Sequence, residues 1–303
     1  MGFLTLRGDE RLFALDGQHR LAGIKKAINE GLEQNPYDEL SVIFVAHKET
    51  TRGLERTRRL FTTLNKTAKP VSKGDIIALD EDDVMAICVR RLIEETDLFA
   101  NDRIAFVASN NMPPANLTSL TTIGNLYDVL SILFTKAESP LRKRKGELQR
   151  ARPSDSDLEK YFEHGREFFI RARQNFPTLD EFFSATKTET VVKKYRGSHG
   201  GDALFRPIGL GVFADIIAQL TKTMPLSDAV KVAAKLPTKL SAAPYAGLIW
   251  DSSSKIILGA HKVTLREILL YMINHSKRSE AELTEKYRKA IGNATANLPK
   301  RVA

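Results

Sequence analysis

The chain has 303 residues, of which 42% are hydrophobic and 27% are charged, a composition typical of a soluble globular protein with room for two domains. The sequence has no run of about 18 apolar residues and no basic segment followed by an apolar one at its start, so it predicts neither a transmembrane helix nor a signal peptide. The formal net charge of +9 favours a polyanionic partner such as DNA or RNA, and the single cysteine, Cys88, excludes an internal disulfide framework and fits a reducing cytoplasm.

The first 80 residues predict an α/β-type domain. Residues 3–6 and 11–15 have the pattern of two short strands joined by a polar turn, and an amphipathic helix is expected from about 18 to 31. The apolar, β-branched run at 40–46 indicates a buried strand, and helices are expected over 52–65 and 75–79. This order, β-β-α-β-α, is typical of the core of an α/β or α+β protein.

From residue 81 onward the pattern is mainly helical. Helices are expected over 82–96, 119–136, 156–174, 208–222, 226–236, 264–275 and 279–292. Asp155 or Ser156 is expected to cap the third of these, and Ser279 lies near the start of the last. A small hairpin is expected near 246–258, and the polar stretches 137–155 and 184–206 are expected to be exposed, partly disordered loops. The predicted fold class is therefore α+β, with a domain at 1–80 followed by a mainly helical domain at 81–303.

Positive charge gathers in two segments. Residues 52–73 carry seven cationic side chains against Glu55, and arginine recurs at helical spacing on one face of the expected helix, at Arg52, Arg56 and Arg59. Residues 142–152 carry six against Glu147, beginning with Arg142, Lys143, Arg144 and Lys145. Either set can contact phosphates or form an ordinary solvated surface. The acidic run at 80–83 is expected to begin a helix, where carboxylates complement the helix dipole, rather than to bind a metal.

The motif that carries chemistry is Asp16-Gly17-Gln18-His19-Arg20, between an expected strand and an amphipathic helix. Gly17 permits a tight turn, and the first amides of a helix favour an anion. Arg20 can bind a phosphate with two hydrogen bonds, and His19 can hydrogen-bond a phosphate or transfer a proton. Gln18 can position water, whereas Asp16 can cap the helix, bind a cation or act as a base. The alternative is structural, because Asp-Gly is a common helix start and Arg20 can simply pair with Asp16.

Three segments carry a resemblance to a known family. LDGQHRLAGI at 15–24 resembles the signature of the DGQHR-domain family, LFTTLNKTAKPVSKGDI at 60–76 resembles its second block, and FRPIG at 205–209 resembles a later one. The chain looks like the DndB-like members of that family, which belong to DNA phosphorothioation clusters. The resemblance covers about residues 5–215. It implies a ParB/sulfiredoxin-like core in which a strand–helix turn binds nucleotide phosphates.

The resemblance implies roles for a few residues. The five signature residues inherit a phosphate or nucleotide role, with Asp16, Gln18, His19 and Arg20 as catalytic candidates and Gly17 and Arg20 as phosphate-binding ones. Asn65 matches the second block, where its amide can cap the helix or touch a ligand, and Arg206 in the third block can meet an anion. Family members usually have a substantial segment ahead of the signature, so a domain with fifteen residues there is expected to be shortened or completed differently.

Other motifs are absent or fit structural roles. The sequence has no Gly-x-x-x-x-Gly-Lys-Ser/Thr loop, no zinc-binding Cys or His cluster and no Gly-x-Ser-x-Gly context, which argues against a P-loop NTPase, a zinc site and a serine hydrolase. Cys88 and Trp250 are expected in the core, and Ser252–Ser254 in a turn. His199 is expected to be exposed in a Gly-rich loop.

The sequence therefore predicts a cytoplasmic, DndB-like DNA-binding protein with a regulatory or accessory role in a DNA-modification or phage-defence system. It is expected to bind mainly the phosphate backbone, since no base-reading motif is evident. The alternative is a ParB-like nucleotide hydrolase or a nuclease, with Arg20 stabilising charge and a nucleoside triphosphate with Mg²⁺ as its cofactor. A third class is a non-catalytic assembly subunit. The expected partners are DNA, a nucleotide and other proteins of a modification cluster, without a membrane; the oligomeric state is open.

Overall fold

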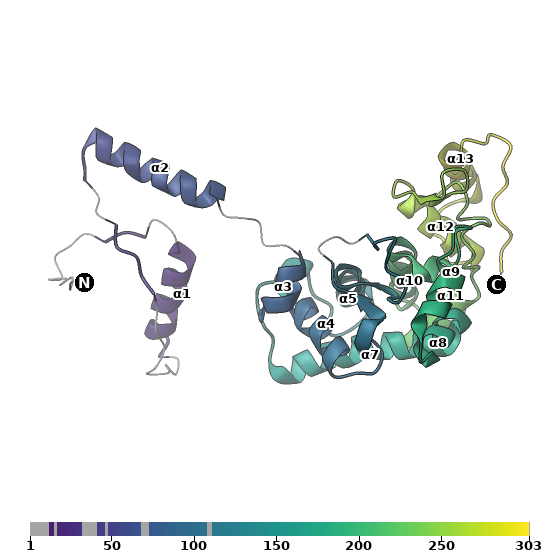
Figure 1. Cartoon of the computed structure of the whole chain (residues 1–303), viewed down its shortest axis with the longest axis horizontal. Helices are drawn as coiled ribbons and strands as arrows, with labels where there is room; N and C mark the ends of the chain where they lie inside the picture. Colours follow the sequence, from purple (N-terminus) through teal and green to yellow (C-terminus); the bar gives the residue numbers. More distant parts are fainter. Residues whose placement is uncertain are drawn as a thin grey trace. The chain divides into compact units, whose positions relative to one another are not determined.

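The computed structural model describes residues 12–14, 17–31, 41–45, 48–67, 73–107 and 111–302 (Figure 1). Within the helices, the side chains of His19, Arg58, Asp75 and residues 61–67 lie outside this description. The chain divides into two compact units, residues 1–70 and 71–303. The domains expected at 1–80 and 81–303 stay a prediction.

The described part of the first unit contains α1 (Gln18–Asn29) and α2 (Thr51–Thr67), which confirms both helices predicted there. The buried strand predicted at 40–46 is wrong over its described residues, because 41–45 have no regular structure and Ile43 is 89% exposed. The strand predicted at 11–15 is described only at 12–14, which are also irregular. The strand predicted at 3–6 lies outside the described residues, so a ParB-like sheet stays a prediction.

The second unit is mainly helical and contains every helix that the sequence predicts after residue 81. Its helices are α3 (Lys73–Leu79), α4 (Val84–Glu94), α5 (Ile123–Lys136), α6 (Lys145–Leu148), α7 (Asp155–Asn175), α8 (Pro177–Ser184), α9 (Thr188–Tyr195), α10 (Pro207–Leu220), α11 (Leu226–Ala234), α12 (Lys262–Met272) and α13 (Glu280–Ile291). Two 3-10 turns add to them, η1 (Asn101–Arg103) and η2 (Ala203–Phe205). Because α3 packs against α4 and α5, it belongs to this unit.

Two short sheets give the fold its β component. β1 (Ile104–Ala105) pairs in parallel with β2 (Thr121–Thr122), with Ile104 opposite Thr121. β3 (Trp250–Asp251) pairs antiparallel with β4 (Ile256–Ile257), which confirms the hairpin predicted near 246–258. The Asp251 carboxylate accepts hydrogen bonds from Ser253 within its turn. Helices with small sheets confirm the predicted α+β class.

The core of the second unit is built around α10. This helix packs against α5, α11 and α12 and is buried over nearly its whole length. Gly209 allows the Ala203 carbonyl to approach its backbone, since a Cβ there would lie 2.0 Å from that oxygen. Cys88 and Trp250 are buried, as predicted. This unit therefore has its own hydrophobic core, and each large apolar side chain that is fully buried there stabilises the fold by about 1.5–3 kcal/mol.

Side-chain caps set several helix starts. The Asp83 carboxylate accepts hydrogen bonds from the amides of Met85 and Ala86, which confirms that the acidic run at 80–83 begins a helix. The Ser279 hydroxyl caps α13 in the same way. The cap predicted at Asp155 or Ser156 is instead Ser154, because α7 begins at Asp155 and its cap is the preceding residue.

The exposed, irregular loop predicted at 184–206 is wrong. Helix α9 and the turn η2 occupy about half of it, and Val191, Val192 and Phe205 are buried. The polarity of this stretch is misleading because its arginines donate hydrogen bonds to carbonyls inside the protein. The stretch at 137–155 is closer to its prediction, since 142–147 are exposed around the short helix α6.

Candidate nucleic-acid interface

The DGQHR turn begins α1. Gly17 is the N-cap residue, with φ +77° and ψ 18°, a left-handed conformation that glycine adopts without strain. The Leu21 amide donates to the Gly17 carbonyl at 3.0 Å and closes the first helical turn. No Asp or Glu lies in that turn to offset the partial positive charge of the helix start. The geometry at Gly17 is compatible with an anion, and anion binding at this turn stays a prediction.

Two of the four predicted catalytic side chains, those of Gln18 and Arg20, lie in the described part of the chain. Gln18 and Arg20 are exposed, and the Gln18 Nε2 donates to the Ala14 carbonyl at 3.2 Å. Asp16 and the side chain of His19 lie outside the described residues. Residues 12–14 are irregular, so the described chain enters α1 from an irregular segment rather than from the predicted strand.

The first basic surface lies on α2. Arg52, Arg56 and Arg59 are exposed, and their spacing puts them on one face of the helix. Arg59 pairs with Glu55 at 2.7 Å, but both side chains are more than half exposed, so this ion pair contributes little to stability. We refer to these three arginines as the α2 stripe. Asn65 lies near the end of α2, and its side chain is outside the described part of the chain.

The second basic surface lies around α6, on residues 142–152, which we call the α6 segment. Arg142 pairs with Glu138 at 2.9 Å, and Arg152 lies 3.4 Å from Glu81. Four exposed cations have no carboxylate within 4.0 Å among the described residues: Lys143, Arg144, Lys145 and Arg150. None of these four side chains therefore forms an ion pair on the described surface, although Lys143 interacts with Asp157 at longer range and helps to lower the pKa of that carboxyl.

Tyr127 of α5 fixes the α6 segment to the core. Its hydroxyl donates to Asp83 Oδ2 at 2.6 Å and accepts from Gln149 Nε2 at 2.8 Å. Burial and the hydrogen bond to Asp83 raise the pKa of Tyr127, so the phenol remains protonated and able to donate. The Nζ atoms of Lys73 and Lys145 lie 5.1 and 6.0 Å from the centroid of its ring.

Lys73 is a neighbour of the α6 segment that the sequence did not predict. It lies in the second family block, yet the fold places it on the same aromatic ring as Lys145 of the α6 segment. Its Nζ also pairs with Asp128 at 2.7 Å. Its positive charge was visible in the sequence, but the contact depends on how α3 packs against α5.

Arg206, the predicted anion-binding residue of the FRPIG block, turns toward the protein. Its Nη2 donates to the carbonyls of Gly200 at 3.1 Å and Arg196 at 3.4 Å. The guanidinium lies 5.9 Å from the Trp250 ring, and its Nε is buried without a hydrogen-bond partner among the described residues. Burial lowers the pKa of Arg206. Its contacts are those of a structural residue, and an anion-binding role stays a prediction.

Arg196 is a partly buried structural arginine that the sequence did not reveal. It donates to the carbonyls of Asn116, Ser119, Leu120 and Phe205 at 2.6–3.1 Å. Burial, together with the charge of Arg206, lowers the pKa of Arg196 to about 10. These contacts tie the segment before β2 to η2.

The other residues singled out in the sequence take structural positions. His199 is exposed, and Ser253 and Ser254 hydrogen-bond to Asp251 in the predicted turn. Burial raises the pKa of Cys88 to about 12, so its thiol stays protonated.

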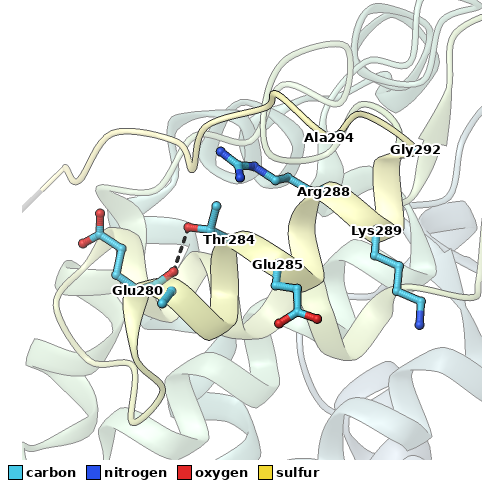
Figure 2. A pocket seen from close by; sticks show the side chains of 8 residues that line it. Glu280, Thr284, Glu285, Arg288, Lys289, Gly292 and Ala294 are labelled. Atoms are coloured by element: carbon cyan, nitrogen blue, oxygen red, sulfur yellow. Dashed lines mark hydrogen bonds between the residues drawn. The ribbon is translucent and has the colours of Figure 1, made fainter.

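Two cavities lie away from the predicted site residues. Figure 2 shows one of about 880 Å³ along α13, where Glu280, Glu285, Arg288 and Lys289 mix both signs of charge and the Thr284 hydroxyl donates to the Glu280 carbonyl. A second, of about 470 Å³, is lined by three arginines together with Glu95 and Asp97. Because each mixes positive and negative side chains, neither is a simple anion site.

The described ranges show neither a metal-binding cluster nor a membrane-spanning helix. They contain no group of three or more His, Cys, Asp or Glu side chains arranged to hold a metal ion. They also contain no helix with the length and apolar character needed to cross a membrane.

Fold and surface together define a basic α+β protein whose second unit is mainly helical and carries, on an anchored segment, four exposed cations without an ion pair among the described residues. The model of the family DndB, described as DNA-sulfur modification-associated, matches residues 1–225. The chain therefore belongs to the DndB family, which gives it a role in a DNA sulfur-modification system. The match includes the DGQHR turn, the α2 stripe and the α6 segment, and it ends immediately before α11. No curated protein and no solved structure matches the chain.

Proposed function

We propose that the chain binds double-stranded DNA through the phosphate backbone, as a regulatory or accessory protein of a DNA sulfur-modification system. The supporting observation is the α6 segment, where four exposed cations lack a carboxylate partner among the described residues. A cation that is already paired must give up its partner to bind a phosphate, whereas these four need not. Other proteins of the modification system are expected partners.

The way the α6 segment is held supports the same proposal. Gln149 hydrogen-bonds to Tyr127, the Tyr161 hydroxyl donates to the Leu141 carbonyl, and Leu148 is buried. A segment already fixed at these points loses less conformational entropy when it binds than a free loop does. Phosphate contacts position a protein on a duplex without reading its sequence, so binding is expected to be sequence-independent.

The test is the salt dependence of DNA binding by the full chain. The variant Lys143→Gln/Arg144→Gln/Lys145→Gln/Arg150→Gln is compared with Lys222→Gln/Lys235→Gln/Lys239→Gln/Lys277→Gln, which removes four lysines elsewhere and matches the charge change. Fluorescence anisotropy of a labelled duplex of about 40 base pairs is measured between about 50 and 200 mM KCl, a range over which phosphate contacts change affinity strongly.

Losing four phosphate contacts makes the slope of log K against log salt shallower by about 3.6. Over this salt range the affinity of the α6 variant therefore falls about 150-fold less than the affinity of the wild type. The matched control is expected to keep the wild-type slope. The proposal is wrong if the α6 variant keeps that slope too, or if the wild-type protein does not bind DNA at the lowest salt concentration.

Nucleotide binding at the DGQHR turn is the second candidate, and it would make the protein a ParB-like nucleotide hydrolase or a nuclease. The observation in its favour is that α1 starts at a left-handed glycine, has no acidic residue in its first turn and carries an exposed Arg20. Arg20 would then stabilise the charge on a nucleoside triphosphate bound with Mg²⁺.

This candidate is tested by ATP binding and by phosphate release with and without DNA. Arg20→Ala is compared with Lys25→Ala, which removes the same charge from an exposed position further along α1. Arg20→Ala is expected to abolish both signals and Lys25→Ala to retain them. A wild-type protein that neither binds nor hydrolyses ATP excludes this function, and equal behaviour of the two variants makes the turn structural.

A further inference from the structure

We propose that both units of this protein engage the same DNA duplex at once, one through the α2 stripe and the other through the α6 segment. This inference rests on the proposed function. The observation behind it is that the two exposed basic surfaces belong to two different compact units. Each unit therefore has its own means of holding a phosphate backbone.

The dimensions of α2 suit a duplex. Its 17 residues extend for about 25 Å at 1.5 Å per residue, and Arg52 and Arg59 lie about 10 Å apart along it. An α-helix fits the major groove, which is about 12 Å wide. The sequence of α2 carries five cations against Glu55, so phosphates are the complementary partner.

Neither surface alone has enough contacts for tight binding. With at most three phosphate contacts from the α2 stripe, where Arg59 must first leave Glu55, and four from the α6 segment, both are expected to fall in the weak, non-specific range of about 10⁻⁴ to 10⁻⁶ M. When one surface is bound, the other meets the same duplex at an effective concentration on the order of 1 mM. For two surfaces that each bind at about 10⁻⁴ to 10⁻⁵ M, simultaneous binding is about tenfold to a hundredfold tighter than either alone.

The experiment compares duplex lengths with the full chain. One variant removes the α2 stripe (Arg52→Gln/Arg56→Gln/Arg59→Gln), a second is the α6 variant described above, and a third combines them. A duplex of about 8 base pairs, about 27 Å long, is as short as α2 itself, whereas one of about 40 base pairs has room for both surfaces. Arg52→Lys/Arg56→Lys/Arg59→Lys keeps the charge and controls for effects on α2 itself, and circular dichroism checks its helix content.

Simultaneous binding predicts that either single variant weakens binding to the longer duplex by about tenfold or more. On the shorter duplex the same variants are expected to change affinity by about twofold, because either surface can occupy it alone. The lysine control is expected to behave as the wild type, and the combined variant to lose binding to both duplexes.

The outcomes separate this inference from the proposed function. If loss of the α2 stripe leaves the affinity for the longer duplex within about twofold of the wild type while the α6 variant lowers it, the second unit binds alone. The inference is then overturned and the proposed function stands. If neither variant changes the affinity, the DNA-binding assignment of both surfaces fails as well.

Discussion

Tyr127→Phe tests whether the anchoring of the α6 segment matters separately from its charge. The change removes one hydroxyl and no charge, and it leaves the ring that contacts Lys73 and Lys145 in place. Two hydrogen bonds disappear, one to Asp83 and one from Gln149. The effect can therefore be calculated from these two contacts.

The larger loss is at Asp83. Its carboxylate is 1% exposed; Oδ1 still caps α4, but Oδ2 loses the Tyr127 hydroxyl. A hydrogen bond to a buried charge contributes about 1.5–3 kcal/mol, whereas the half-buried Gln149 can turn to water at a loss of about 0.5 kcal/mol. Tyr127→Phe should thus lower the free energy of unfolding by about 2–3.5 kcal/mol, which for a unit of this size is about 4–14 °C in melting temperature.

Urea unfolding of Tyr127→Phe, Asp83→Asn and the double variant measures the coupling directly. The single amide oxygen that Asp83→Asn introduces can still cap α4, but the amide NH2 takes the place of Oδ2 and cannot accept from the Tyr127 hydroxyl, so this change removes that hydrogen bond and keeps the cap. DNA affinity of Tyr127→Phe is expected to fall about two- to fivefold with an unchanged salt slope, since the cations remain and only one anchoring hydrogen bond is lost. A change in unfolding free energy below about 0.5 kcal/mol, or strictly additive single changes, would refute the reasoning.

Three further predictions follow from individual residues. Burial lowers the pKa of His164, whose Nε2 has no hydrogen-bond partner among the described residues. Above about pH 6.5 this imidazole is neutral in both the folded and the unfolded chain, so its contribution to stability is complete. As the pH falls below about 6.5, the imidazole is protonated first in the unfolded chain, and stability is lost. His164→Phe should flatten the melting temperature between about pH 7.5 and 5, and an unchanged pH profile would contradict this. Arg196→Met removes four hydrogen bonds to carbonyls and should lower the unfolding free energy by about 3 kcal/mol in urea; an unchanged midpoint at the same m-value would contradict it. In Gly17→Ala the new Cβ meets no atom within 4 Å, but alanine at φ +77° is unfavourable by about 1–2 kcal/mol. Hydrogen exchange of the α1 amides should therefore accelerate. An exchange rate equal to that of the wild type would show that the turn tolerates a Cβ.

The helices could be predicted from the sequence because their signals are local. Apolar residues at helical spacing and capping side chains such as Asp83 and Ser279 lie within the segments they specify. The run at 41–45 shows the limit of such patterns. Its β-branched residues favour a strand, but a strand also needs a neighbour that pairs with its backbone, and the described residues provide none.

The prediction for residues 184–206 was wrong because a pattern typical of a loop conceals ordered structure. This stretch is rich in polar and small residues, which are typical of loops, yet Arg196 and Asp202 use their polar groups inside the protein. The Asp202 carboxylate accepts from the Leu204 amide and the Thr238 hydroxyl, and Arg196 reaches the Asn116 carbonyl, 80 positions away in the sequence. Contacts over such separations leave no periodic signal in one sequence.

Whether a charged group is bonded inside the protein also decides which positive charges belong to the candidate interface. A net charge of +9 indicates a polyanionic partner, but it does not say which cations are free to bind one. Arg196 and Arg206 donate hydrogen bonds to backbone carbonyls, and Arg142 forms an ion pair with a carboxylate at 2.9 Å. Counterion release scales with the number of phosphates that cations contact, and a cation without an ion-pair partner makes such a contact most readily. The four cations of the α6 segment therefore predict the salt dependence of the second unit better than the net charge does. What makes this surface a candidate for DNA is therefore that four exposed cations, none of them in an ion pair among the described residues, lie on a segment that Tyr127 and Tyr161 anchor to the core.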